Sequence, residues 1–293
     1  MHLMSIRDAS ILSENWETPL CAWRLCLFLF VAPCFVFFRW CIAMIKQFPL
    51  IIPAAVALVF VFLPVLQAGD FNVNEKACGE YCEASDQCAV IDTLNPPLQP
   101  INTWTNLAFL VAGLMVFRRR KDRVGKLFLA ATIVLTVGSG MFHAFMTRGG
   151  QLADEIGMYA VFSFLAVYAT FVTFKLDLKN VWPITIASGV VGLLLAFFVT
   201  ELASTSVLAI LSLVIIGALI VGALNKRTSW KAIGMALLPF AVAFLFRQLD
   251  IMRVICDPQS WFQGHGVWHV LAAVGVYMIF QQIEKIDGEL VEA

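Results

Sequence analysis

The sequence predicts an all-α integral membrane protein, in which a seven-transmembrane-helix bundle follows extra N-terminal hydrophobic segments. Three observations predict this fold class. Of the 293 residues, 60% are hydrophobic and 14% are charged, whereas a soluble protein carries about 25% charged residues. The mean hydropathy is +0.85. Seven apolar runs are each close to the roughly 20 residues that a helix needs to cross a bilayer. They lie at 101–117, 127–146, 156–174, 181–200, 205–224, 230–246 and 263–283.

Composition also excludes several classes of protein. A chain this apolar cannot cover a water-facing surface, which excludes soluble dinucleotide-binding and sandwich folds. The 20 basic and 20 acidic residues cancel, so no basic surface is available for a nucleic acid. Membrane barrels are built from short alternating strands, whereas these runs are continuous and rich in Leu, Ala, Phe and Gly.

The region before the seven runs is predicted to be an N-terminal extension, residues 1–68. It contains an apolar helix at 48–68 that follows Lys46 and ends near small residues. This pattern fits a signal anchor and a cleavable signal peptide equally. Met44 is an alternative start, which would place 1–43 outside the protein.

Loop charges predict the orientation of the bundle through the positive-inside rule. Four basic residues fall on one side of the predicted membrane: Lys76, Arg148, Arg247 and Arg253. Twelve fall on the other side: Arg118, Arg119, Arg120, Lys121, Arg123, Lys126, Lys175, Lys179, Lys226, Arg227, Lys231 and Lys285. The side with twelve belongs in the cytoplasm. The acidic, cysteine-containing segment 69–100 is therefore extracytoplasmic, and the tail 284–293 is cytoplasmic.

Cysteine usage agrees with this orientation. Four cysteines fall in the N-terminal extension, and the other four lie in segments assigned to the extracytoplasmic side: Cys78, Cys82, Cys88 and Cys256. Extracytoplasmic compartments permit disulfides, and four cysteines allow two bridges in three pairings. The residues alone neither choose among these pairings nor exclude free thiols.

Three of the four histidines lie inside predicted helices and share one depth. His265 and His269 are four residues apart, so both rings face one side of a helix. His143 lies near the extracytoplasmic end of the second run, roughly 5 Å from that end at about 1.5 Å per residue. Ionisable groups at membrane depth are costly and indicate function by default. The pattern predicts that the three imidazoles meet.

Two further polar residues are expected to lie beside the histidines. Ser139 lies one turn from His143 on the same helix face, and Asp154 follows the turn at 148–150 and opens the third helix. Three imidazole ligands with a fourth position for water are the pattern of catalytic zinc. Ser139 and Asp154 are therefore predicted catalytic residues, with Asp154 moving a proton and Ser139 hydrogen-bonding an oxyanion. A metal-free proton relay and plain interhelical hydrogen bonding are the competing interpretations.

Several short motifs follow one another between about residues 79 and 283. They are EYCE at 80–83, QPINTWTN at 99–106, Ser139-x-x-x-His143 with Asp154, Asp250 with Cys256, and His265-x-x-x-His269. In order and spacing they resemble the alkaline ceramidase family, within a superfamily of seven-helix membrane hydrolases that includes the adiponectin and progestin receptors. The resemblance implies that 101–283 is a ceramidase-like domain. It also implies that His143, His265 and His269 bind zinc.

The same resemblance implies a calcium site before the first helix of the bundle. Its ligands map onto Glu80, the Tyr81 carbonyl and Glu83, whereas two further expected oxygen ligands fall on Ser85 and neutral Gln99. Calcium favours six to eight oxygen ligands that include several carboxylates. A calcium site and a solvated acidic loop therefore both remain open.

The family's disulfide maps onto Cys82 and Cys256, which leaves Cys78 and Cys88 for a second bridge. At the extracytoplasmic end of the sixth helix, Arg247 and Asp250 are three residues apart and are expected to pair.

Together, residues and resemblance predict a zinc-dependent intramembrane hydrolase of sphingolipid metabolism. It would cleave the amide bond of ceramide or a related N-acyl lipid and release a fatty acid at an extracytoplasmic mouth. The expected partners are this lipid and the bilayer, with no nucleic acid and no indication of an obligate protein partner. The alternatives are an esterase for phospholipid or GPI-type lipids and a seven-helix receptor with structural zinc. A transporter is disfavoured because no internal repeat or broken helix is visible.

Overall fold

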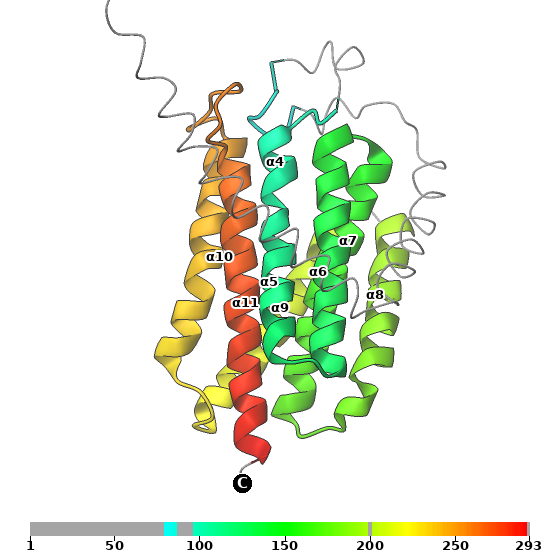
Figure 1. Cartoon of the computed structure of the whole chain (residues 1–293), viewed down its shortest axis with the longest axis vertical. Helices are drawn as coiled ribbons and strands as arrows, with labels where there is room; N and C mark the ends of the chain where they lie inside the picture. The colour runs from blue at the N-terminus through cyan, green and yellow to red at the C-terminus, as the bar shows by residue number, and fades with distance from the viewer. Residues whose placement is uncertain (1–78, 87–95, 199–200, 292–293) are drawn as a thin grey trace, which may run out of the picture. The chain divides into compact units, whose positions relative to one another are not determined.

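The structure is a computed structural model that describes residues 79–86, 96–198 and 201–291. These ranges are mostly helical and contain no strand. The helices are α4 (Pro100–Thr105), α5 (Leu107–Arg119), α6 (Arg123–Phe145), α7 (Arg148–Thr173), α8 (Val181–Phe198), α9 (Glu201–Leu224), α10 (Trp230–Ile251) and α11 (Gly264–Val291), with a short 3-10 turn η2 at Leu178–Asn180 (Figure 1). The all-α fold class is confirmed.

Six helical stretches in the described ranges are long and apolar enough to span a membrane: Pro100–Arg119, Arg123–Phe145, Arg148–Thr173, Ser206–Leu224, Trp230–Ile251 and Gly264–Gly288. The first combines α4 and α5, which meet at Asn106. The predicted run at 181–200 is helical over Val181–Phe198, the 18-residue α8. The chain is thus a multi-pass membrane protein. The predicted helix at 48–68, Cys78 and Cys88 lie outside the described residues.

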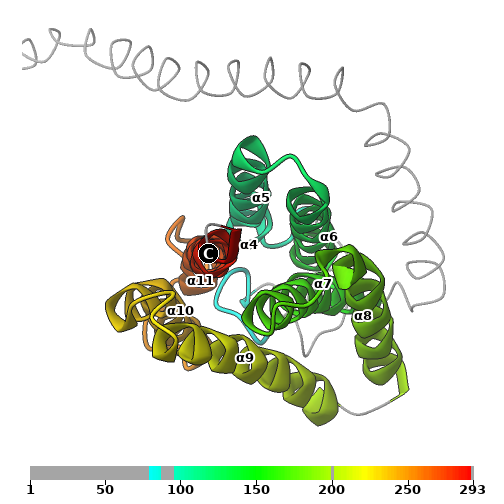
Figure 2. The same ribbon diagram turned by 90° about the horizontal axis from the view of Figure 1, so that it is seen from below.

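The helices surround a common interior, which places distant parts of the chain side by side. α6 packs along α7, and α10 packs along α11; viewed along the bundle, α4 and α5 stand beside α11 and α6 (Figure 2). Residues 79–86 lie at one end of the bundle, over its middle. The loop 252–263 lies at the same end. We call it the disulfide end, because Cys82 and Cys256 are bonded there. The opposite end, with the loops 120–122, 174–180 and 225–229, is the basic end.

Two glycines allow α6 and α7 to approach closely beside the predicted site. A Cβ atom on Gly138 would lie 2.1 Å from the Ala153 carbonyl oxygen. A Cβ atom on Gly157 would lie 2.5 Å from the Cα atom of Leu135. Because neither position has room for a side chain, the backbones meet there. This approach brings Ser139 on α6 next to Asp154 on α7.

The start of α7 differs from the prediction. The helix begins at Arg148, so Asp154 lies in its second turn rather than at its opening. Thr147 caps the helix by accepting a hydrogen bond from the Gly150 N–H at 3.1 Å. The glycines at 149–150 were interpreted as a turn, but Gly150 packs its first helical turn against α6, where a Cβ atom would lie 2.9 Å from the Cα atom of Phe142.

The end of α11 also differs from the prediction. The helix continues to Val291, so most of the segment predicted as a tail is helical. At the basic end, Arg120 donates to the Tyr168 hydroxyl at 2.6 Å and to Asp287 at 2.8 Å. Arg119 pairs with Glu284 at 3.3 Å. These contacts join the last turns of α11 to α5 and α7. They explain why the helix extends beyond the apolar run from which it was predicted.

Aromatic rings fill the core between the site and the basic end. Phe128 lies 4.7 Å from Phe280 between ring centroids. Phe164 lies 5.6 Å from Phe128 and stacks with Tyr168 at 5.9 Å. All four side chains are fully buried, and such offset ring pairs add about 0.5–1.5 kcal/mol each beyond their area. This layer holds α6, α7 and α11 in register below the histidines.

Replacing Gly157 should destabilise the bundle. Gly157→Ala forces the α6–α7 backbones apart, and overpacking of this kind costs about 1–3 kcal/mol. Gly234→Ala is the matched control, because no atom lies within 4 Å of its added methyl group and alanine favours a helix. Thermal unfolding in detergent should show a lower midpoint for Gly157→Ala alone. Equal midpoints for both variants would contradict the close approach.

Candidate metal centre

The three predicted histidines lie together at the disulfide end of the bundle interior. His143 comes from α6, and His265 and His269 come from the first two turns of α11. Their ring centroids lie 4.9 Å (His143–His265), 5.0 Å (His143–His269) and 4.5 Å (His265–His269) apart. One ring nitrogen from each residue lies within 4.8 Å of the others. The three rings are buried.

Two of these rings are oriented by hydrogen bonds to neighbouring side chains. The Nδ1 atom of His143 lies 2.8 Å from Oε1 of Gln99; because an amide oxygen only accepts, Nδ1 carries the proton. The Nδ1 atom of His269 lies 3.0 Å from the Thr105 hydroxyl, which donates its own proton to the Ile101 carbonyl at 2.8 Å. His269 therefore also donates through Nδ1. Both residues keep the Nε2 lone pair for another partner.

The position of His265 is fixed through its backbone. Asp250 at the end of α10 accepts from the His265 N–H at 3.1 Å and from the Cys82 N–H at 2.9 Å. Asp250 is fully buried, so these bonds supply the partners that its carboxylate needs. The expected pairing of Arg247 with Asp250 is wrong. Arg247 instead pairs with Glu80 at 3.4 Å, because Asp250 turns inward to cap α11.

Two ring nitrogens of this cluster are available to bind a ligand. The Nε2 atom of His143 and the Nδ1 atom of His265 are buried and have no hydrogen-bond partner among the described residues. Buried ring nitrogens are normally paired, and a metal ion would satisfy both. Orientation of each ligand by a second group is also the usual arrangement around bound metals. The cluster therefore fits a metal ion that accepts three neutral nitrogen ligands.

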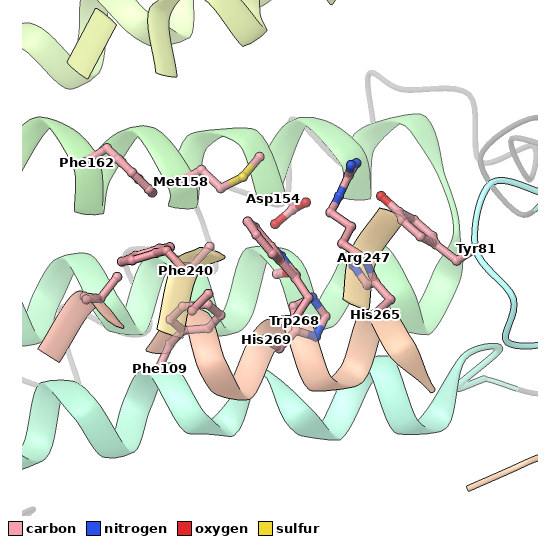
Figure 3. Close-up of a pocket in the computed structure, with 14 residues that line it drawn as sticks. Tyr81, Phe109, Asp154, Met158, Phe162, Phe240, Arg247, His265, Trp268 and His269 are labelled. Atoms are coloured by element: carbon pink, nitrogen blue, oxygen red, sulfur yellow. The ribbon is translucent and has the colours of Figure 1, made fainter. Parts of the chain in front are cut away.

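Ser139 and Asp154 lie beside the histidines and line the same cavity. Ser139 is buried on α6 and hydrogen-bonds the side chain of Asp154 on α7. The cavity has a volume of about 100 Å³. Figure 3 shows Asp154 pointing into it from α7, Arg247 reaching across it from α10, and His265 and His269 facing it from α11. Its other half is apolar, lined by Phe109, Leu135, Met158, Phe162, Phe240, Ala272 and Val276.

Tyr81 covers the histidines from the disulfide end. Its ring centroid lies 3.9 Å from that of His265 and 5.4 Å from that of His143. Burial, together with the nearby charge of Glu80, raises the pKa of the Tyr81 hydroxyl above its ordinary value. Tyr81 is therefore a neutral hydroxyl at the polar end of the cavity. It adds a hydrogen-bonding group that the sequence did not identify as part of this site.

Residues 79–86 are fastened across this end by a disulfide. Cys82 and Cys256 are bonded, with Cα atoms 5.4 Å apart and a sequence separation of 174 residues. The pairing implied by the family resemblance is present. The bridge joins the segment directly to the loop 252–263, and the Ala84 N–H adds a hydrogen bond to the Pro258 carbonyl at 3.3 Å.

The residues of the predicted calcium site are engaged in other contacts. The Glu83 carboxylate accepts from the Ile101 N–H at 2.7 Å and the Asn102 N–H at 2.8 Å, at the start of α4. Burial raises the pKa of Glu83, and these two hydrogen bonds offset part of that rise. The Glu80 carboxylate pairs with Arg247. Both carboxylates thus have partners within the protein, so this donor set does not fit calcium, which favours several free carboxylate oxygens.

Sequence reasoning missed the residues that orient the histidines. Gln99, Thr105 and Asp250 each hold one histidine, although Gln99 appeared only as a neutral replacement at the calcium site. A single sequence offers no signal for Gln99 or Thr105, because their partners are 44 and 164 residues away. Asp250 could have been found, since an acidic residue at the end of an apolar helix needs a buried partner.

The comparison with known families agrees with this geometry. A family model described as Ceramidase matches residues 99–291. The chain belongs to the ceramidase family. The match covers α4 through α11 and includes Gln99, the three histidines, Ser139 and Asp154. A search of curated proteins finds no match. Membership of the ceramidase family indicates a membrane enzyme that hydrolyses ceramide, with an amide bond as its target.

Removing any one histidine should reduce the bound metal. His143→Ala, His265→Ala and His269→Ala each leave two nitrogen ligands, which is too few for a stable site. Metal analysis of purified protein should give one divalent ion per chain and much less in each variant. Trp261→Ala is the control, since Trp261 is an exposed side chain at the same end of the bundle. A full complement of metal in His269→Ala would rule out the shared site.

Proposed function

We propose that this member of the ceramidase family is a zinc-dependent hydrolase that cleaves the amide bond of ceramide or a related N-acyl lipid and releases a fatty acid. The observation that carries this proposal is that the histidine cluster, with two ring nitrogens unpartnered among the described residues, shares a cavity with the Ser139–Asp154 pair. Three neutral imidazoles next to a carboxylate suit zinc better than the oxygen-preferring magnesium or calcium.

Each residue of the site has a separate proposed role in the reaction. His143, His265 and His269 would hold the ion, which when bound would acidify a water ligand and polarise the scissile carbonyl. Asp154 is placed to accept a proton from the attacking water and to return it to the leaving amine. Ser139 donates to the Asp154 carboxylate and so fixes its direction. This differs from the oxyanion contact predicted for Ser139, because its proton is already committed.

The cavity matches the two ends of an N-acyl lipid. Its polar half carries Tyr81, Asp154 and Arg247, where an amide and its headgroup would lie. Its apolar half suits an acyl chain. A cavity of about 100 Å³ is smaller than the about 150 Å³ cavity that holds benzene. A long acyl chain must therefore continue past the inner end, where the rings of Phe162 and Phe240 lie 6.4 Å apart.

The orientation of the site follows from the loop charges. The basic end carries the clustered arginines and lysines and belongs in the cytoplasm, so the disulfide end would be extracytoplasmic, where disulfides persist. His143 lies within one turn of the end of α6. A site at that depth is accessible to water from outside and to lipid from the adjacent leaflet.

Hydrolysis should depend on the metal. Purified protein is expected to release fatty acid from ceramide in detergent, to lose this activity after treatment with a zinc chelator, and to regain it when zinc is added back. A phospholipid of the same acyl composition is the matched substrate, and hydrolysis of the phospholipid alone would point to the esterase alternative. Full activity in chelated, metal-free protein would refute the zinc mechanism.

Asp154 should be needed for turnover and not for metal binding. Asp154→Asn keeps the shape and the hydrogen bond but cannot accept the proton, so kcat should fall by about 10²–10⁴ with the metal content unchanged. Ser139→Ala should lower kcat less, because Asp154 remains. Glu155→Gln changes a neighbouring acid on α7 and serves as the control. A normal kcat in Asp154→Asn would exclude its proposed role.

Phe162 should limit the acceptance of long acyl chains. Phe162→Ala opens the inner end of the cavity, and enclosing even two more methylenes at about 0.8 kcal/mol each corresponds to roughly tenfold. The ratio of kcat/KM for a hexadecanoyl substrate to that for a hexanoyl substrate should rise accordingly. Phe244→Ala, on the exposed face of α10, should leave the ratio unchanged. An unchanged ratio in Phe162→Ala would place the acyl chain elsewhere.

A further inference from the structure

Several oxygen atoms of segment 79–86 accept hydrogen bonds from other groups of the protein. The Gly79 carbonyl accepts from Nη2 of Arg253 at 2.5 Å, and the Ser85 hydroxyl accepts from Nη1 of the same guanidinium at 2.8 Å. A positive group thus already bridges the two ends of the segment. Arg253 sits next to α10 in the left-handed conformation, with φ of 59°. A non-glycine residue keeps this conformation only where surrounding contacts hold it.

Gln99 occupies the centre of the same region. Its Nε2 atom donates to the Glu83 carbonyl at 3.1 Å, and its Oε1 atom accepts from Asn102 at 3.1 Å as well as from His143. Gln99 is fully buried. A neutral amide both donates and accepts, which a carboxylate cannot do. Gln99 can therefore join the segment to the metal ligand without any cation between them.

Glu83 completes the connection, since both of its carboxylate oxygens accept backbone N–H groups of α4. A carboxylate at a helix N-terminus is stabilised there. Three different kinds of group, a guanidinium, an amide and a helix end, thus bond the Gly79 and Glu83 carbonyls, the Ser85 hydroxyl and the Glu83 carboxylate.

We propose that Arg253 and Gln99 take the place of a bound divalent cation at the disulfide end, so that the segment 79–86 is held over the site without calcium. Both are positioning residues. Arg253 holds the segment that places Tyr81 against His265, and Gln99 sets the tautomer of His143. The proposal concerns the stability and the metal affinity of the chain, so it stands apart from the identity of the substrate.

The direct test is the response of the purified protein to calcium. A ligand that binds only the folded state raises the thermal midpoint, and extracellular calcium modules bind at about 10⁻⁴–10⁻³ M. The wild-type midpoint should be the same in excess calcium chloride, magnesium chloride or EGTA, with zinc held constant. A midpoint several degrees higher in calcium than in magnesium would overturn the proposal.

Variants separate positioning from general stability. In Arg253→Gln, amide hydrogen exchange should rise in residues 79–86 and in the loop 252–263, whereas Arg253→Lys should restore part of the protection. Arg148→Gln removes an exposed arginine from the same end and should leave exchange unchanged. Protection equal to wild type in Arg253→Gln would show that Arg253 does not hold the segment.

The role of Gln99 is tested by the affinity of the protein for its metal. Gln99→Leu removes the acceptor for His143, and loss of such an orienting group lowers metal affinity by about 10–100-fold. Competition with a chromophoric chelator measures this affinity without substrate, so an inactive chain can still be tested. Gln99→Glu keeps the acceptor for His143 and should retain more of the affinity than Gln99→Leu. Unchanged affinity in Gln99→Leu would overturn the positioning role.

Discussion

Burial of three imidazole rings inside an apolar bundle is the constraint on which the rest of the site depends. A buried polar atom without a partner costs free energy, and each ring brings two such atoms. Gln99 and Thr105 satisfy one nitrogen each on His143 and His269. The remaining nitrogens face one another within 4.8 Å. A metal cation can satisfy several of them together, because each neutral imidazole offers one lone pair.

The segment 79–86 is part of the site as much as the helices are. It supplies Tyr81, whose ring lies against that of His265, and Glu83, which accepts hydrogen bonds from the start of α4. Its fastening to the loop 252–263 joins residues 174 positions apart. The polar end of the cavity is therefore built from a short stretch of chain that has no regular structure. Its position follows from hydrogen bonds and a disulfide, whereas the apolar end follows from helix packing.

The helices of this member of the ceramidase family place the histidines near one end of the bundle, which is the depth that the proposed cleavage of a lipid amide requires. The histidines lie within the first turns of α11 and the last turn of α6, and the aromatic layer around Phe128 and Phe280 closes the bundle beneath them. A lipid carbonyl lies near the membrane surface, with its acyl chain directed inward. The cavity has the same polarity along its length, from Arg247 and Asp154 at one end to Phe162 and Phe240 at the other.

Sequence by itself determined the fold class and the composition of the candidate site. Apolar runs of membrane-spanning length and helical spacing are local properties, so they predicted the helices and the shared depth of His143, His265 and His269. Helix ends were less predictable. The helix α7 begins before Asp154 because Gly150 packs on α6. The helix α11 extends beyond its apolar run because Arg120 binds Asp287.

Only the tertiary structure decided how the site is held together. Arg247 pairs with Glu80 rather than with its near neighbour Asp250, which instead caps α11. Gln99 and Thr105 orient histidines far away in the sequence. A hydrogen bond acts over about 3 Å in space whatever the separation along the chain. Partner choice among buried polar groups therefore depends on which backbones meet, and that was settled by the packing of the bundle.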